Sequence, residues 1–474
     1  MKTVSSVDAA WLEIMKDLQA GDECSPRDKK IKELKNYSIC ITNPRKRLVL
    51  NPLRAISLPF AFGELIWYLN AKNDVETMQY YSRNMRSFSD DGLTLNSAYG
   101  YRIFGKHPAI PFDQWQHVAN QIKKDIDTRQ AIIHLHTPNN EETKDEVCTL
   151  TLQFMVRGGK LDMFVNMRSN DIVTGFTYDA FSFAVMQELM ANELNLPLGN
   201  YYHNAASMHI YQKHFYLLDS VESLYDYLSY FVDKYSSEFS FEGITLASEE
   251  LKRLMQYEHT LRTTSASEFN TKPFKNESLN VMLDVFVKYQ DHKAGRSSDL
   301  KYDNIYHTSL RNYFGEKSLK ESNLKESKLI IVEGCDGVGK STFCDGLLRP
   351  GWDCMHFAKP DSSFNPAIYY YSILSRGDRV LDRSFISEVI YSSYFGRTRL
   401  IGDKELDYLL HLLHYRMVLN NNAKIVFLIA KQPDALAQKQ EDETLDIEDI
   451  NETYKLFCDY MNFLGFSVYK IERA

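Results

Sequence analysis

Long apolar segments are missing from this 474-residue sequence, in which no stretch approaches the roughly 18 apolar residues that a membrane-spanning helix requires. The N-terminus also lacks the apolar core and the small-residue cleavage site of a secretory signal peptide. Residues 6–20 instead carry apolar side chains at helical spacing, which predicts an amphipathic helix. We therefore expect a cytoplasmic protein with no membrane partner.

Cysteine is scarce and scattered. The seven cysteines form no CxxC pair and no group with the spacing of metal ligands. This scatter argues against a disulfide framework and a zinc motif, and it is typical of a reducing compartment. Most of the thiols are expected to be inert packing residues.

Positive charge is not in excess, because 55 Lys and Arg residues face 63 Asp and Glu residues, for a formal net charge of −8. A protein whose main partner is a nucleic acid is expected to be basic, so we predict no general DNA binding. The apolar fraction of 44% is that of a globular protein, and the length predicts two or more domains.

A change in composition suggests where the domains meet. Apolar density falls between about residues 291 and 327, and residues 316–327 are rich in Lys, Glu and Ser. Such a composition is typical of a solvated linker. We therefore predict three parts, namely a domain at 1–300, a charged linker at 301–327 and a second domain at 328–474.

The second domain opens with a phosphate-binding motif. A buried-type strand at 329–332 is followed by G-x-x-x-x-G-K-[ST] and then by a helix. Backbone N–H groups of such a loop bind phosphate oxygens, the lysine neutralises charge and the serine hydroxyl binds Mg²⁺. The expected ATP-binding residues are Gly334, Asp336, Gly337, Gly339, Lys340, Ser341 and Thr342. Further strands are expected at 354–358, 379–382, 424–430 and 467–471; because helices alternate with them, the fold class is α/β with a parallel sheet.

Two segments of this domain, EGCDGVGKST (333–342) and VLDRSFIS (380–387), resemble thymidylate kinases and related nucleoside monophosphate kinases. The resemblance implies that Arg383 binds the acceptor phosphate and that Asp382, with Ser341, lies near the magnesium ion. The expected lid at 437–444 has Lys439 but no arginine, which departs from the family and weakens the case for turnover more than for binding. The alternatives are a regulatory nucleotide-binding module and a kinase of hydroxymethyl bases in DNA.

The first domain is organised around residues 148–180, which contain a candidate nucleophile, Cys148. The pattern predicts two strands joined by a Gly158-Gly159 turn, then a loop and a buried helix at about 178–195. Taken alone, Cys148 would be interpreted as a packed strand cysteine. Its neighbours in the sequence give it another meaning.

Residues 7–290 resemble the thymidylate synthase superfamily through several motifs in the family's order. These motifs are FGELIWYL (62–69), AYGYR (98–102), TRQ (128–130), Cys148 with the following QF and Gly-Gly turn, MRSND (167–171) and MHIY (208–211). The resemblance implies an α+β fold, with a mixed sheet and packed helices. It also implies a homodimer, because the family's TRQ-position arginine, here Arg129, reaches the partner's nucleotide.

The resemblance assigns roles to these residues. The implied catalytic residues are Cys148, Glu64, Asp179 and Tyr99. The implied nucleotide-binding residues are Arg45, Arg47, Arg129, Arg168, Ser169, His209 and Tyr211, and Asp171 would contact the pterin of methylenetetrahydrofolate. A thiolate adds at C6 of a pyrimidine and makes C5 reactive, and the arginines are expected to lower the thiol pKa.

Two departures from the family select the base and the reaction. Asp179 replaces the family's asparagine, and a carboxyl group suits the amino group and N3 of cytosine better than an amide does. The family's tryptophan segment is absent from residues 87–97, so a wetter site would favour addition of water. Both departures resemble phage-type deoxycytidylate hydroxymethylases, which act in the host cytoplasm. The alternatives are dUMP hydroxymethylation and reductive methylation.

Overall fold

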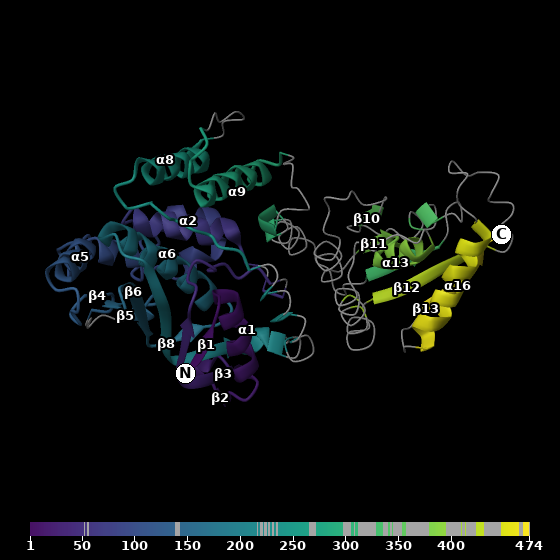
Figure 1. Ribbon diagram of the computed structural model, residues 1–474, viewed down its shortest axis with the longest axis horizontal. Coiled ribbons are helices and arrows are strands. Elements are labelled where there is room, and N and C mark those ends of the chain that lie inside the picture. Colours follow the sequence, from purple (N-terminus) through teal and green to yellow (C-terminus); the bar gives the residue numbers. More distant parts are fainter. Residues whose placement is uncertain are drawn as a thin grey trace. The chain divides into compact units, whose positions relative to one another are not determined.

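The computed structural model divides into two compact units, Met1–Asp299 and Leu300–Ala474, which we describe separately (Figure 1). The structure describes residues 1–51, 53–54, 56–137, 143–215, 217–218, 221, 225, 228–229, 232–233, 236–264, 272–296, 305–307, 309–310, 329–334, 340–341, 344, 353–356, 379–394, 409, 413, 423–430, 447–463 and 468–473. None of the described helices is both long enough and apolar enough to cross a membrane.

The first unit is built on a mixed eight-stranded sheet of order β1-β3-β8-β6-β5-β4, with β2 added to β3 and β7 added to β8. Its strands are β1 (Lys2–Val4), β2 (Asp22–Cys24), β3 (Ile31–Ile41), β4 (Ile132–His134), β5 (Thr149–Arg157), β6 (Lys160–Met167), β7 (Asn170–Asp171) and β8 (Leu198–Tyr211). The β3–β8 and β5–β6 pairs are antiparallel, whereas β6–β8 and β7–β8 are parallel. A mixed sheet with packed helices agrees with the predicted α+β class.

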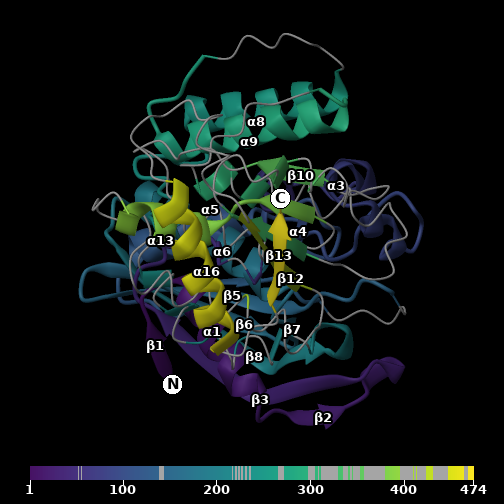
Figure 2. The same ribbon diagram turned by 90° about the vertical axis from the view of Figure 1, so that its right-hand side faces the viewer.

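Helices cover one face of this sheet in layers. They are α1 (Val7–Leu18), α2 (Leu58–Leu69), α3 (Val75–Tyr81), α4 (Tyr99–Ile103), α5 (Gln114–Lys124), α6 (Phe176–Leu194), α8 (Glu249–Thr263) and α9 (Glu277–Lys293), with short 3₁₀ turns η1 (Pro26–Asp28), η2 (Arg83–Ser87) and η3 (Gln212–His214). Helix α6 packs on β6 and β8, α2 packs on α6, and α8 and α9 lie side by side over α2 (Figure 1, Figure 2). Helix α6 is therefore the centre of the core.

The local sequence explains the elements that frame the site. Ser57 caps α2 by accepting a hydrogen bond from the Phe60 N–H, and Pro59 fits its first turn. Gly158 and Gly159, with φ of 56° and 73°, form the two-residue turn between β5 and β6. The predicted strand–turn–strand–helix order of residues 148–195 is confirmed.

Two segments of the first unit form neither helix nor strand. At residues 48–51, the backbone N–H groups of Leu50 and Asn51 donate to the buried carboxylate of Asp8 instead of to a neighbouring strand. Residues 236–248 form an irregular segment in which the Phe241 N–H donates to Glu188. In both places a buried carboxylate takes the backbone donors that regular structure would use.

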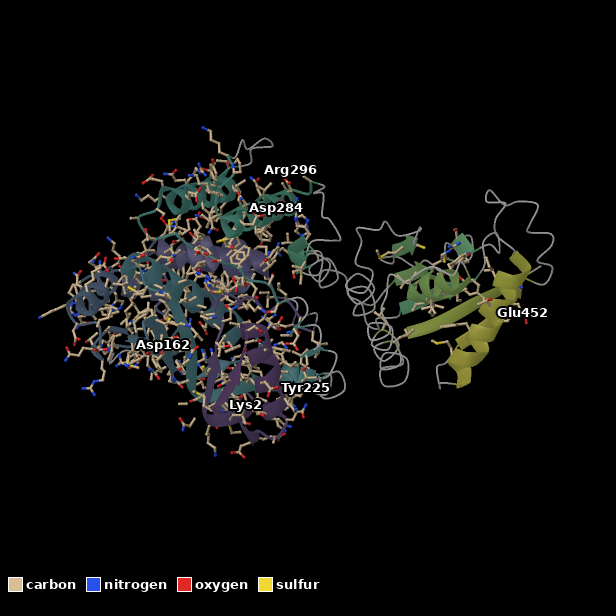
Figure 3. The ribbon with its side chains drawn as sticks, in the orientation of Figure 1. Lys2, Asp162, Tyr225, Asp284, Arg296 and Glu452 are labelled. Atoms are coloured by element: carbon tan, nitrogen blue, oxygen red, sulfur yellow. The ribbon has the colours of Figure 1, made fainter. Side chains whose placement is uncertain are left out.

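The polar face of α1 is bound by Lys2, which lies just before the helix, and by Tyr225, which lies far away in sequence. Lys2 binds Glu13 at 2.8 Å and Asp17 at 2.7 Å, and the hydroxyl of Tyr225 also donates to Glu13. Lys2 and Tyr225 are labelled in Figure 3. The apolar face of α1, including the fully buried Trp11, faces the core. The predicted amphipathic helix is therefore confirmed.

The second unit contains a five-stranded, all-parallel sheet of order β10-β11-β9-β12-β13. Its elements are β9 (Leu329–Glu333), β10 (Asp353–His356), β11 (Arg379–Asp382), α13 (Phe385–Tyr394), β12 (Ala423–Ala430), α16 (Ile447–Phe463) and β13 (Val468–Arg473). The strands agree with the predicted parallel sheet. The linker residues 311–327, the loop residues 335–339 with Thr342, and the expected lid with Lys439 lie outside the described residues.

Candidate active site

Cys148 and Arg168 lie at the open end of the β5–β6 hairpin, one on each strand side, and are therefore neighbours in space. Cys148 directly precedes β5 and Arg168 directly follows β6, so the antiparallel pairing brings the Arg168 N–H to the Cys148 carbonyl at 2.9 Å. The Arg168 Nη2 lies 3.5 Å from the Cys148 sulfur. Its guanidinium is fixed by hydrogen bonds to the carbonyl oxygens of Val147 and Glu146, each at 2.9 Å. A cation is thus held beside the predicted nucleophile.

The thiol of Cys148 is nevertheless hard to ionise in the free protein. Burial is the largest influence and raises the pKa of Cys148, and the charges of Asp179 and Asp145 act in the same direction. Arg168 lowers this pKa, in the direction predicted, but burial has the larger effect. Desolvation of the thiolate outweighs the attraction of one arginine.

Two acidic side chains share the interior of the site. Glu64 lies on α2 and Asp179 lies in the first turn of α6, which packs against α2. Burial, followed by the charge of Asp179, raises the pKa of Glu64 to about 8. Burial likewise raises the pKa of Asp179 to about 7, opposed by a hydrogen bond from Asn170. Both groups can therefore take up and release protons near neutral pH.

Tyr99 joins this group through an unusually close approach of two helices. A Cβ atom added to Gly100 would lie 1.9 Å from the carbonyl oxygen of Tyr68, so only glycine lets α4 pack this near α2. The Tyr99 ring consequently lies 5.4 Å from the ring of Tyr68. Burial and the charges of Asp179 and Cys148 hold the pKa of Tyr99 well above its usual range, so its hydroxyl remains a proton donor.

A line of hydrogen bonds runs behind Asp179. Its Oδ2 accepts from Nδ2 of Asn170 at 2.8 Å. The Asn170 Oδ1 lies 3.0 Å from Nε2 of His203, and the His203 Nδ1 lies 3.1 Å from the hydroxyl of Tyr201. No sequence motif gives Tyr201 and His203 a role, because alternating aromatic and polar residues are ordinary in strands.

The end of β8 places three of the predicted nucleotide-binding residues next to one another, beside β7. Asp171 is paired with His209 in the parallel β7–β8 ladder, and the Ser169 hydroxyl lies 3.5 Å from Nδ1 of His209. The ring of Tyr211 meets the His209 ring edge-on at 5.1 Å. Ser169, His209 and Tyr211 are therefore brought together.

Asp171 has a structural task of its own. Its carboxylate accepts from the backbone N–H groups of Val173 and Thr174 and from the Thr174 hydroxyl. These bonds fix the turn that leads into α6 and so place Asp179. The contact between Asp171 and a pterin stays a prediction, and it would use the remaining lone pairs of the carboxylate.

Arg27 is a site residue that the sequence reasoning missed. It lies in η1 on an exposed loop, with a positive φ of 52°. Its charge lowers the pKa of the Cys148 thiol, and its side chain binds the Tyr211 hydroxyl. The S-P-R-D segment has neither helical nor strand periodicity, so the sequence gives no sign that Arg27 belongs to the site. Its positive φ, which is uncommon for a non-glycine residue, is visible only in the structure.

The structure corrects the phosphate-binding role predicted for Arg47. This side chain is fully buried, and its Nη2 binds Glu188 at 2.6 Å while its Nε donates to the Pro44 carbonyl. Arg45 also binds Glu188, at 2.8 Å, although it keeps some exposure. Glu188 lies nine residues beyond Asp179 on α6, roughly 13 Å along the helix. The buried carboxylate of Glu188 needs a compensating positive charge, which Arg47 supplies. Arg47 is therefore a core residue.

Arg129 faces outward from its own unit. It lies in the exposed loop between α5 and β4, and its carbonyl oxygen accepts from Nε2 of Gln153 at 2.8 Å. In the described part of the chain its side chain makes no hydrogen bond to the Cys148 group. The predicted contact with a partner's nucleotide is therefore neither made nor prevented within one chain.

In the second unit, the described residues centre on Glu333 at the end of β9. Its buried carboxyl accepts from the hydroxyls of Ser384 at 2.5 Å and Ser387 at 2.7 Å. Burial raises the pKa of Glu333, and the charges of Arg383 and Lys340 oppose this shift. Arg383 has a φ of 75°, which is rare for a non-glycine residue. Across the described ranges of both units, no three His, Cys, Asp or Glu side chains gather as metal ligands.

The first unit, which contains the Cys148 site, is similar in sequence to known proteins. Residues 12–224 match the protein-family model described as thymidylate synthase. The deoxyuridylate hydroxymethyltransferase of Bacillus phage SP01 is 37% identical over 206 residues, which cover 41% of this chain and 54% of that protein.

Two further relatives show the range of the likeness. The deoxyuridylate hydroxymethyltransferase of Pseudomonas phage M6 is 31% identical over 39% of this chain and 52% of that protein. The thymidylate synthase of Bacillus licheniformis is 30% identical over 32% of this chain and 57% of that protein. The chain thus spans about half the length of the curated relatives that it matches.

Proposed function

We propose that the first unit transfers a one-carbon group to C5 of a deoxypyrimidine nucleoside monophosphate, and that the reaction is hydroxymethylation of dCMP. The observation that carries this proposal is the Cys148–Arg168 pair at 3.5 Å, enclosed with Glu64 and Asp179. The thymidylate synthase match and the hydroxymethyltransferase names of two relatives support the reaction class.

The reaction balances with water as a reactant. One dCMP, one methylenetetrahydrofolate and one water give 5-hydroxymethyl-dCMP and tetrahydrofolate. The folate supplies the one-carbon unit. Cys148 forms a bond to C6, which makes C5 nucleophilic, and the same bond breaks when the product is complete.

The side chains around Cys148 serve its charge and the protons that move. Arg168 stabilises the thiolate, and a bound nucleotide that excludes water would strengthen this attraction. Glu64 is placed to pass protons to and from the base, since its pKa of about 8 lets it exist in both forms near neutral pH. The proton lost from C5 leaves through such a group to solvent.

The choice of cytosine follows from Asp179. Its carboxyl group can accept from the cytosine amino group and, when protonated, donate to N3. A pKa of about 7 makes that proton available near neutral pH. A second candidate is dUMP, because two relatives are named deoxyuridylate hydroxymethyltransferases and a protonated carboxyl can also pair with O4 and N3–H.

The test is the mass of the product. The full chain is incubated with methylenetetrahydrofolate and either dCMP or dUMP, with a Cys148→Ala variant as the blank. A CH₂O increase on dCMP is the expected result. The same increase on dUMP alone would assign the second candidate, a CH₂ increase would indicate reductive methylation, and no increase on either nucleotide would overturn the proposal.

We also propose that the first unit forms a homodimer through the face of the sheet opposite α6. On that face Phe164 and Tyr202 stack at 4.4 Å, with ring planes 2° apart, and both remain partly exposed. A dimer would cover this pair and let Arg129 reach the partner's site. Sedimentation equilibrium should give twice the chain mass, whereas a monomer with full activity would contradict the proposal.

For the second unit we propose binding of ATP with Mg²⁺ and phosphorylation of a deoxynucleoside monophosphate. The parallel sheet, the motif around Gly334 and the nearness of Lys340 and Arg383 to Glu333 support it. The test supplies ATP and either dCMP or 5-hydroxymethyl-dCMP and measures diphosphate formation, with Lys340→Ala as the control. ATP binding without turnover would favour a regulatory module, and turnover only on hydroxymethylated DNA would favour a DNA-base kinase.

A further inference from the structure

The hydrogen-bonded line behind Asp179 is buried along its length. Tyr201 and His203 are fully buried, and Asn170 is 3% exposed. Tyr201 and His203 lie two residues apart on β8, so their side chains share the sheet face that α6 covers. The ring of Phe176 meets the His203 ring edge-on at 4.9 Å and closes the other side. Water is thus kept from the line, and its donors and acceptors must satisfy one another.

Tyr201, the residue at the end of this line, determines which groups donate and which accept along it. Burial lowers the pKa of His203 to about 3, so its ring is neutral and carries one N–H. Burial also holds the pKa of Tyr201 well above its usual range, so its hydroxyl keeps its proton. Among the residues that the structure describes, that hydroxyl has one hydrogen-bond partner, Nδ1 of His203.

The remaining bonds are then determined one after another. Because Nδ1 of His203 accepts from Tyr201, Nε2 carries the N–H and donates to Oδ1 of Asn170. The Asn170 amide must therefore direct its NH₂ group toward Oδ2 of Asp179. The phenol at one end thus fixes which atom of the amide meets the carboxyl at the other end.

This direction decides where a proton can reside on Asp179. With Asn170 donating to Oδ2, the proton of the neutral acid lies on Oδ1. The acid then offers a nucleotide base one donor, Oδ1–H, and one acceptor, Oδ2. In the reversed line, Oδ2–H would donate to Asn170, and the base would meet acceptors only. Cytosine presents an acceptor at N3 and a donor at C4, whereas uracil presents a donor at N3 and an acceptor at C4. A proton fixed on one oxygen of Asp179 therefore favours one base over the other.

We propose that Tyr201, His203 and Asn170 are positioning residues that set the donor and acceptor pattern of Asp179 and thereby the base preference of the site. This inference rests on the proposed C5 transfer to a deoxypyrimidine nucleotide. It assigns specificity to residues that need not touch the base, and it makes the tautomer of one buried histidine the deciding feature.

Other titratable groups also act on the carboxyl of Asp179, so the test must leave them in place. They are Glu64 and Tyr68 of α2, Tyr99 of α4, Cys148 before β5 and Asp171 of β7. Substitutions confined to β8 change the line without altering any of these groups.

Three variants separate the line from simple packing. Tyr201→Phe removes the hydroxyl alone, after which His203 can place its proton on either nitrogen. His203→Leu removes both hydrogen bonds. His203→Gln keeps an amide oxygen to accept from Tyr201 and an NH₂ to donate to Asn170. The matched control is Tyr37→Phe, which removes a hydroxyl from β3 of the same sheet, where it donates to Asp17 at 2.8 Å.

The measurement is kcat/KM of the full chain for dCMP and for dUMP as a function of pH. The rate is determined from the release of tritium from C5 of the nucleotide. Tyr201→Phe and His203→Leu should change the ratio of the two values by roughly fivefold or more, the size of one lost hydrogen bond. Their pH profiles should move to higher pH, because a weaker donor at Asn170 stabilises the Asp179 carboxylate less. His203→Gln and Tyr37→Phe should retain the wild-type ratio.

An equal loss of kcat/KM on both nucleotides in Tyr201→Phe and His203→Leu, with an unchanged pH profile, would overturn the inference. The hydrogen-bonded line would then contribute only to packing. If His203→Leu does not fold, Tyr201→Phe decides alone. A wild-type chain that releases tritium from neither nucleotide would instead overturn the proposed function, which distinguishes the two failures.

Discussion

Nη2 of Arg168 lies 3.5 Å from the sulfur of Cys148, and the guanidinium is fixed by the carbonyl oxygens of Val147 and Glu146. Burial raises the pKa of the thiol, and Arg168 is the largest influence that lowers it. The reactivity of Cys148 is therefore a balance between burial, which raises the thiol pKa, and nearby cations, chiefly Arg168, which lower it. This balance can be measured before any substrate is known.

Arg168→Ala should make the Cys148 thiol less reactive. Its pKa should rise further, and its alkylation rate at a fixed pH should fall about tenfold for each unit of that rise. Peptide mass mapping after iodoacetamide treatment at several pH values follows this one cysteine. Arg157→Ala is the control, because Arg157 is an exposed arginine at the end of the same hairpin. An alkylation profile unchanged by Arg168→Ala would contradict the assignment.

Glu64→Gln should stabilise the fold at high pH. The pKa of Glu64 is raised by burial, so the folded chain binds more protons than the unfolded chain between the ordinary carboxyl range and about pH 8. Stability therefore falls as pH rises through that window. The variant, which cannot ionise there, should melt several degrees above wild type at pH 8.5, for a difference on the order of a few kcal/mol, and the two should converge near pH 4.

The control for this pH effect is Glu249→Gln on α8, whose side chain is 87% exposed. It should follow the wild-type curve throughout. Melting curves of Glu64→Gln that stay parallel to wild type from pH 4 to pH 8.5 would show that the Glu64 carboxyl is not held in a desolvated place.

Arg47→Met tests whether Arg47 belongs to the core or to the phosphate site. Removing it leaves the buried carboxylate of Glu188 with less compensation, which should lower the free energy of unfolding by about 3–5 kcal/mol. Urea unfolding measures this loss, and the variant that remains folded should keep the KM of wild type for its nucleotide. Unchanged stability with a KM raised by an order of magnitude would restore the phosphate role.

Gly100→Ala should destabilise the site although alanine favours helices. Its Cβ would lie 1.9 Å from the Tyr68 carbonyl oxygen, so α4 must move away from α2. We expect a loss of about 3 kcal/mol or more, together with lower turnover because Tyr99 moves. Gly158→Ala has open space around its Cβ and a positive φ, so it should cost about 1–2 kcal/mol. Equal losses in the two variants would argue against the close approach.

The sequence predicted well where local pattern and turn chemistry decide the structure. The β5–β6 hairpin was predictable from two strand-like runs around Gly158-Gly159, and its register alone brings Cys148 to Arg168. The grouping of Ser169 with His209 and Tyr211 followed from motif order. The parallel strands of the second unit were likewise predictable from buried runs that alternate with helices.

The misses share a physical cause, which is that the deciding partner lies far away in sequence. Arg47 can be buried because Glu188, 141 residues later in the sequence, accepts its hydrogen bond and compensates its charge. No local sequence pattern reveals this pairing. Arg27 approaches Cys148 only through the loop conformation of η1. The roles of Tyr201 and His203 depend on α6 covering their face of the sheet.

The most direct test of the central claim is release of tritium from C5-labelled dCMP and dUMP by wild type, Cys148→Ala and Asp179→Asn in the presence of methylenetetrahydrofolate. We predict that wild type releases tritium faster from dCMP, that Cys148→Ala releases none, and that Asp179→Asn shifts the preference toward dUMP. Release by Cys148→Ala at the wild-type rate, or an unchanged preference in Asp179→Asn, would contradict this prediction.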